Sequence, residues 1–192
     1  MTEIDIVNKA LLKLGQEPII SFYDENERAK AANVIYESIR DLELSTYRWS
    51  FAIRRIALEE CHNKPDFGFE KQYPLPPNFL RFLYIEGANP NDVDNYSIEN
   101  NHILCNYDSP LKIIYLERVT EPELFPPYFC EVLACKLAFE LCERLKQDPA
   151  RKQVLMSEYQ FALSNAKKTN AIQMASQRMP NSRLITARFG GY

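Results

Sequence analysis

The first residues of the chain show the apolar spacing of a short amphipathic helix. Thr2 is followed three residues later by Asp5, the pattern of an N-cap with an acidic residue at the third helical position. Apolar side chains then recur at helical spacing, at Ile4, Val7, Leu11 and Leu14. Gly15 and Pro18 are typical of a helix end and of a segment that does not resume the helix. The pattern predicts a helix that ends near residue 14.

A second helix is predicted to begin near Asp24, with Glu27 in the capping-box position. Its predicted buried face consists of Ala31, Val34, Ile35, Ile39 and Leu42. The helical pattern breaks between residues 45 and 50, which include Trp49, the single tryptophan of the chain. We expect Trp49 to anchor the junction between this helix and the segment that follows, and a functional role for it is the alternative.

The period of the apolar residues changes between residues 51 and 119. Short apolar runs there are separated by turn-forming residues, such as Asn100-Asn101 and Asp108-Ser109-Pro110. The segment 71–77 contains three prolines, so it is not expected to form a central strand. The pattern predicts an antiparallel β meander of roughly four to six strands.

Helical spacing returns after Pro126-Pro127. Residues 129–145 are apolar almost all round, which is typical of a helix at the centre of a bundle. Asp148-Pro149 supplies a cap and a first-turn proline for a last helix that extends to about Gln177. Leu155, Tyr159, Ala162 and Ala166 have helical spacing along it.

These elements predict an α+β fold that is mainly α. Residues 1–50 and 120–178 are expected to form a helical bundle, residues 51–119 an inserted β-rich subdomain, and residues 179–192 a flexible, extended C-terminal tail. A chain of 192 residues is long enough for one domain that carries such an insertion.

Charge is distributed unevenly along the chain. The formal net charge is −3, but residues 149–192 contain seven basic residues and a single acid, Glu158, so this segment carries +6 and the remainder −9. Such asymmetry is typical of a docking arm or of a protein with an acidic partner. The alternative is a solvated basic face on the last helix.

The C-terminal tail combines this positive charge with apolar side chains outside any periodic segment. Apolar residues on an extended segment favour a partner that orders them on binding, although a terminus without a role is the alternative. The residues predicted to bind a partner are Arg178, Arg183, Leu184, Ile185, Arg188, Phe189 and Tyr192.

Motifs for catalysis are scarce in the sequence. The five glycines form no phosphate-binding pattern, and the two histidines, His62 and His102, lie 40 residues apart without metal-ligand spacing. The odd count of five cysteines fits reduced core residues, and the adjacent Cys61-His62 is the nearest approach to a reactive pair. A glycan hydrolase requires two facing carboxylates, which a sequence with many acids leaves open. We predict no catalytic, cofactor-binding or metal-binding residues, and no membrane span.

The order of several motifs resembles that of tail tubular protein A and the head-to-tail adaptor proteins of short-tailed bacteriophages. The resemblance covers about residues 4–165. It lies in the opening segment 6–18, which ends in Leu-Gly and a proline loop, in Trp49-Ser50-Phe51 at the helix exit, in the Tyr-x-Leu-Pro segment at 73–81, and in the alanine- and leucine-rich helix around 131–138.

The resemblance implies a non-enzymatic virion protein, made in the bacterial host cytoplasm and assembled at the head-to-tail junction. It implies a ring of twelve copies that docks on the portal protein, contacts a downstream tail protein, and extends the channel through which DNA leaves without sequence-specific binding. It also implies that the C-terminal segment reaches towards the portal. A peptidoglycan-degrading glycan hydrolase carried by the tail is the alternative, because lytic activity is attributed to one branch of these adaptors; no motif in this chain supports it.

Overall fold

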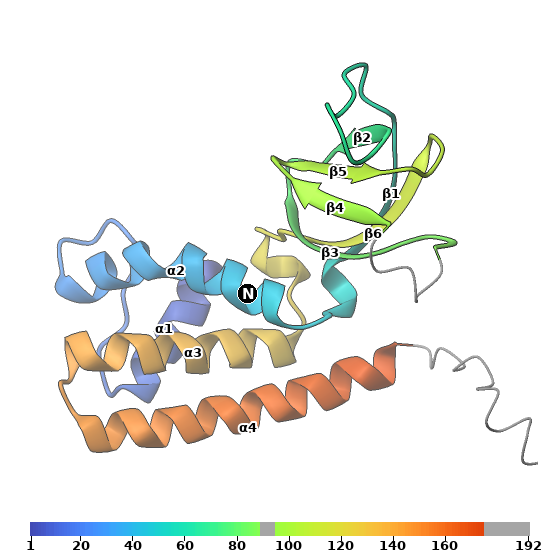
Figure 1. Ribbon diagram of the computed structural model, residues 1–192. Helices are drawn as coiled ribbons and strands as arrows, with labels where there is room; N and C mark the ends of the chain where they lie inside the picture. The colour runs from blue at the N-terminus through green and yellow to red at the C-terminus, as the bar shows by residue number, and fades with distance from the viewer. Residues whose placement is uncertain (89–94, 175–192) are drawn as a thin grey trace, which may run out of the picture.

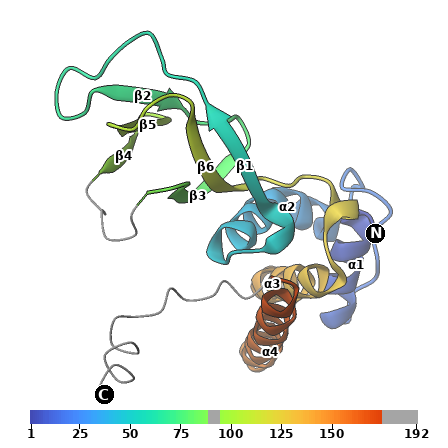
Figure 2. The ribbon, with the colours of Figure 1, turned by 90° about the vertical axis from the view of Figure 1, so that its right-hand side faces the viewer.

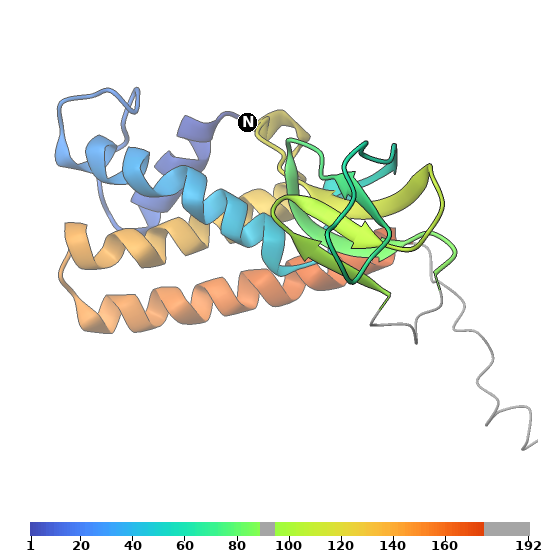
Figure 3. The ribbon, with the colours of Figure 1, turned by 45° about the horizontal axis from the view of Figure 1, so that its top comes forward.

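The computed structural model describes residues 1–88 and 95–174 of the chain. Within them, the helices α1 (Glu3–Lys13), α2 (Glu27–Thr46), α3 (Pro127–Leu145) and α4 (Pro149–Gln173) form the helical part. Helices α2, α3 and α4 lie in a row with α3 in the middle, and α1 packs behind α3 (Figures 1 and 3). The strands form a separate unit at one end of this row (Figure 1). The chain is therefore α+β and mainly α, as the sequence predicts.

Local capping signals determine where the first and last helices begin. The hydroxyl of Thr2 accepts a hydrogen bond from the amide of Asp5, whose carboxylate accepts one from the amide of Thr2, so the capping box is complete. Asp148 caps α4 through the amide of Arg151, with Pro149 in the first turn. Both starts agree with the sequence, while α4 ends at Gln173 rather than near Gln177.

Helix α2 starts at its cap Asn26, two residues later than predicted, and its buried face matches the expected one only in part, since Ala31 and Ile39 are buried and Ile35 is partly buried. Val34 and Leu42 were predicted to be buried but are 73% and 50% exposed. The buried residues are Ala29, Ala31, Ala32, Tyr36, Ile39, Arg40, Glu43 and Leu44. Helix α3 packs against α2, and the face that α2 buries includes a tyrosine, an arginine and a glutamate. An apolar period alone does not identify such a face.

Helix α3 is the centre of the helical core. It packs against α1, α2 and α4, which agrees with its nearly continuous apolar sequence. Its buried residues are Phe129, Cys130, Val132, Leu133, Ala134, Cys135, Leu137, Ala138, Leu141 and Cys142. The five cysteines of the chain are all free thiols. Four of them are buried, as the prediction of reduced core residues requires, but Cys61 is partly exposed, so that prediction is wrong for Cys61.

The strands form two three-stranded antiparallel sheets rather than one meander. The first sheet has the order β1 (Ile53–Leu58), β6 (Leu111–Glu117), β3 (Phe79–Ile85), and the second has the order β2 (Lys71–Pro74), β5 (His102–Cys105), β4 (Tyr96–Glu99). The first sheet lies nearer to α2, and the second lies beyond it (Figure 2). Of the paired strands, only β4 and β5 follow each other directly in the chain. As predicted, the proline-rich β2 is an edge strand.

Strand β6, the central strand of the first sheet, contributes residues to two hydrophobic cores. Its Ile113 and Tyr115 belong to a core within the insert, and its Leu116 belongs to the core of the helices. Alternation along a strand directs neighbouring residues to opposite faces, so one strand contributes to both cores.

Two asparagines form the tight turn between β4 and β5. Asn100 and Asn101 adopt φ values of +44° and +63° and connect β4 to β5, the backbone that a two-residue hairpin turn requires.

None of the described helices has an apolar stretch long enough to cross a membrane.

Candidate partner-binding surfaces

The C-terminal end of α4 is fastened to the segment that enters the insert. Asn170, which is fully buried, accepts a hydrogen bond from the amide of Ser50 (2.8 Å) and donates one to the carbonyl of Arg48 (3.0 Å). The hydroxyl of Tyr128 donates to Gln173 in the last turn of α4 (3.0 Å). The point from which the C-terminal residues continue is therefore fixed relative to both the helices and the sheets.

Trp49 lies at the centre of this junction. Its ring is fully buried, and its indole N–H donates to the carbonyl of Glu43 (2.8 Å). The rings of Tyr47, Tyr128 and Phe129 lie 5.1–6.2 Å from it, centroid to centroid. Such an aromatic cluster adds packing energy beyond its buried area. The predicted structural role of Trp49 as the anchor of the junction is confirmed.

The residues predicted to bind a partner lie outside the described part of the chain. These residues are Arg178, Arg183, Leu184, Ile185, Arg188, Phe189 and Tyr192, and their role stays a prediction.

The basic residues of α4 itself are mostly engaged within the molecule. Arg151 contacts Glu158 (3.4 Å) and donates to the carbonyl of Lys13 (2.5 Å), while the ammonium group of Lys167 lies over the ring of Tyr47. Lys152 forms an ion pair with Glu143. Because these cations already have partners, the charge available for docking is concentrated after residue 174, where the sequence has three arginines and no acid.

A concave surface at the far end of the insert brings together groups that the sequence keeps apart. The groove has a volume of about 840 Å³ and is lined by Cys61, His62 and Glu60 together with His102 and Glu99. One ring nitrogen of His102 lies 2.7 Å from the carbonyl of Asn100. The two histidines are 40 residues apart in the sequence, and both line this groove, His62 from the loop after β1 and His102 from β5. Among the residues described, no three histidine, cysteine, aspartate or glutamate side chains gather closely enough to hold a metal ion.

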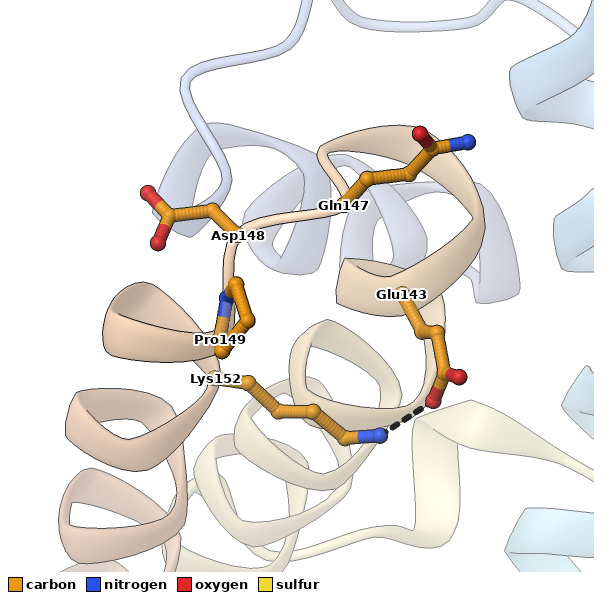
Figure 4. A pocket seen from close by; sticks show the side chains of 5 residues that line it. All are labelled: Glu143, Gln147, Asp148, Pro149 and Lys152. Atoms are coloured by element: carbon orange, nitrogen blue, oxygen red, sulfur yellow. Dashed lines mark hydrogen bonds and ion pairs between the residues drawn. The ribbon is translucent and has the colours of Figure 1, made fainter.

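A second cavity, of about 490 Å³, lies at the turn between α3 and α4 (Figure 4). Its carboxylates are those of Glu143 and Asp148, and Glu143 points toward Lys152, with which it forms an ion pair (Figure 4). The hydrogen bond from Lys152 lowers the pKa of Glu143. A general acid for glycan hydrolysis requires the opposite shift, so this arrangement does not suit that reaction.

Two other carboxylates in the helical part have strongly altered environments. Burial raises the pKa of Glu43, against a hydrogen bond from Tyr159 (3.0 Å), but this side chain is 1% exposed. Burial also acts to raise the pKa of Glu131, yet the hydrogen bonds from Lys13 and Lys9 outweigh it and lower the pKa to about 2. Neither group combines access to a substrate with the raised pKa of a general acid.

The loop between α1 and α2 presents apolar residues that the sequence reasoning did not select. In residues 17–26, here called the acidic loop, Ile20 and Tyr23 are each 90% exposed. The sequence does contain a signal for these exposed apolar residues, because Ile19-Ile20 and Phe22-Tyr23 are apolar pairs inside a loop bounded by Pro18 and Asn26.

Comparison with known proteins found no protein-family model and no curated protein that matches this chain. The resemblance based on ordered motifs therefore stays a prediction.

Proposed function

We propose that this chain is a non-enzymatic head-to-tail connector of a short-tailed bacteriophage or prophage. In this proposal several copies form a ring that docks on the portal protein, meets a downstream tail protein, and continues the channel through which DNA leaves. The protein is made in the host cytoplasm and resides in the virion at the head-to-tail junction. DNA passes through the ring without being read, and no cofactor takes part.

One observation supports the proposal above the others: a basic, apolar C-terminal segment starts from a rigidly fastened helix end. Asn170 joins the end of α4 to the entrance of the insert, and Tyr128 joins it to the start of α3. A segment that emerges from a fixed point can dock with less loss of orientational freedom than one that emerges from a loose end. The contacts with assembly partners are assigned to the arginines and apolar residues between Arg178 and Tyr192.

The charge distribution supports the same assignment. Arg151 and Lys152 of α4 form ion pairs within the molecule, whereas the last 18 residues carry three arginines without an acid. Arginine is the residue that interfaces favour for contacts with carboxylates, because its planar group forms paired hydrogen bonds. The expected partner surface is therefore acidic and partly apolar.

The proposal is tested by binding to isolated portal rings. A chain that ends at Gln177 is expected to lose at least tenfold in affinity relative to the full chain. Replacing Arg178, Arg183 and Arg188 by Gln tests the charge alone. Its matched control replaces three exposed bases elsewhere, Lys30, Arg55 and Lys64, by Gln, with the same change in net charge. If the shortened chain joins portal rings with unchanged affinity, the docking role of the C-terminal segment is wrong.

The alternative, a glycan hydrolase, has its best place in the groove at the tip of the insert, where Glu60 and Glu99 line a concave surface. The purified protein is expected to release no product from cell-wall material. Activity that disappears in Glu60→Gln or in Glu99→Gln, while folding is unchanged, would establish the hydrolase instead.

A further inference from the structure

The acidic loop is rigidly braced, although it lies on the surface. The side-chain amide of Asn8 donates to the carbonyl of Ile19 (2.9 Å) and accepts from its amide (2.8 Å). The amide of Ile20 donates to the carboxylate of Asp24 (2.9 Å), and the amide of Tyr23 donates to the hydroxyl of Ser21 (3.1 Å). These bonds fix the loop backbone before any partner arrives.

Alternate apolar side chains of the loop point inwards and outwards. Ile19 is 3% exposed, and the ring of Phe22 packs against Tyr36 with centroids 5.6 Å apart. Ile20 and Tyr23 are the outward members of the two pairs. Two large apolar side chains on a braced backbone lose little conformational freedom when a partner covers them, and buried aromatic residues are frequent energetic centres of interfaces.

The charges of the loop indicate a basic partner. The acidic loop contains three carboxylates and no basic residue, and Glu27 follows it as the first residue of α2. Arg28 contacts Glu17 (3.1 Å) and Arg144 contacts Glu27 (3.4 Å). Asp24 and Glu25 form no ion pair within the part of the chain that the structure describes. The acidic loop thus presents two exposed apolar side chains, Ile20 and Tyr23, beside the negative charges of Asp24 and Glu25.

Residues 178–192 have the complementary chemistry. They contain three arginines and no aspartate or glutamate, and the apolar residues Leu184, Ile185, Phe189 and Tyr192 lie between and beyond these bases. A basic segment with apolar residues matches an acidic loop with apolar residues both in the sign of charge and in the kind of surface it buries.

The placement of the two surfaces favours contact between different copies. The acidic loop lies at the ends of the helices that are far from the insert, whereas α4 ends on the side of the insert (Figures 1 and 3). The 25 residues of α4 extend about 36 Å at 1.5 Å per residue. The ten residues from Met174 to Leu184 extend at most about 36 Å when fully stretched. Leu184 therefore reaches its own loop only at full extension, whereas Phe189 and Tyr192 lie far enough along the chain to reach it. Binding within one copy is the monomeric outcome of the test, and a neighbouring copy allows Leu184 and Phe189 to make the contact together.

We propose that residues 178–192 of one copy bind the acidic loop of the next copy, with Ile20 and Tyr23 as the apolar centre of the contact. Two different surfaces then meet, so a pair of copies keeps one free acidic loop and one free C-terminal segment, and repetition yields a ring or an open chain. This inference rests on the proposed connector function for its biological setting and names a partner of the C-terminal segment within that assembly.

The test uses the full chain alone, without portal protein, and measures mass against concentration by sedimentation equilibrium. Ile20→Ser with Tyr23→Ser is expected to weaken self-association about thirtyfold or more, because it removes the central apolar side chains. The control Phe67→Ser removes an equally exposed aromatic residue from the insert, 89% exposed, and leaves association unchanged. Glu25→Lys weakens association, and raised salt reduces the difference from the unmodified chain.

Mixing two defective variants tests whether the two surfaces differ. The loop variant keeps its C-terminal segment, and a variant with Leu184→Ser and Phe189→Ser keeps its loop. Each variant alone stays monomeric, and their mixture forms one-to-one dimers that grow no further. Thermal unfolding of each variant, expected to match that of the unmodified chain, verifies folding.

Three results overturn the inference: no association of the full chain tighter than about 1 mM, unchanged association of the loop variant, or a monomeric mixture. The same results leave the connector proposal standing if the full chain binds portal rings and the chain ending at Gln177 does not. Conversely, self-association through the loop without portal binding refutes the connector and keeps the inference.

Discussion

Replacing Asn170 by Ala is expected to loosen the junction between the helices and the insert. The change removes the acceptor of the Ser50 amide and the donor to the Arg48 carbonyl. Both backbone groups lie in a partly buried segment next to the fully buried Trp49, so each is left without a partner in a place that water reaches poorly.

The expected loss of stability follows from the two backbone groups that lose their partners, the Ser50 amide and the Arg48 carbonyl. An unsatisfied buried donor or acceptor costs about 1–3 kcal/mol, and the partial exposure of this segment places each loss near the lower end. The free energy of unfolding should fall by about 2–4 kcal/mol. For a chain of this size that corresponds to a decrease in Tm of about 5–15 °C. Asn170→Asp keeps the acceptor but sets a carboxylate against the Arg48 carbonyl, so it should be at least as destabilising as Ala.

Urea unfolding followed by tryptophan fluorescence measures the effect directly, since Trp49, the single tryptophan, lies within the junction. The matched control is Asn165→Ala, an exposed position on the same helix, for which the change should stay within about 0.5 kcal/mol. If Asn170→Ala proves as mild as this control, the junction does not depend on these hydrogen bonds and the fixed origin of the C-terminal segment is lost as an argument.

Two further predictions concern the pH dependence of stability. Burial raises the folded-state pKa of Glu43, so the contribution of this group to stability is fully present below pH 4.5 and is lost as the pH rises through the raised pKa. Glu43→Gln should remove this loss. Identical pH profiles of the unfolding free energy in the two proteins would contradict the prediction. The pKa of Glu131 is lowered to about 2, despite burial, by Lys13 and Lys9. The contribution of Glu131 to stability is therefore present above pH 4.5 and lost as the pH falls toward 2. Glu131→Gln should lower the free energy of unfolding by about 1 kcal/mol at pH 7. This figure is reduced for solvent screening because the Glu131 side chain is 35% exposed. An equal cost of that substitution at pH 7 and pH 2.5 would refute this assignment.

Local chemistry made the starts of α1 and α4 and the fold class predictable. The capping box at Thr2 and Asp5, and the cap and proline at Asp148-Pro149, act within one helical turn, so the sequence alone specifies them. The nearly continuous apolar run of α3 also identified its central position, because such a helix is stable in water only when other elements cover all its sides. The buried role of Trp49 followed from its place at a break in the helical pattern.

The sequence by itself thus determined the helices, the turns and the uneven charge, whereas only the tertiary structure decided which faces are buried and which distant residues meet. Strand order depends on pairings between segments far apart in the chain, and β1 pairs with β6 across more than fifty residues. The exposure of Val34, the burial of Asn170 and the outward direction of Tyr23 depend on which helix or loop covers each of them. Periodicity records that a face is apolar, but a neighbouring element decides whether that face is covered.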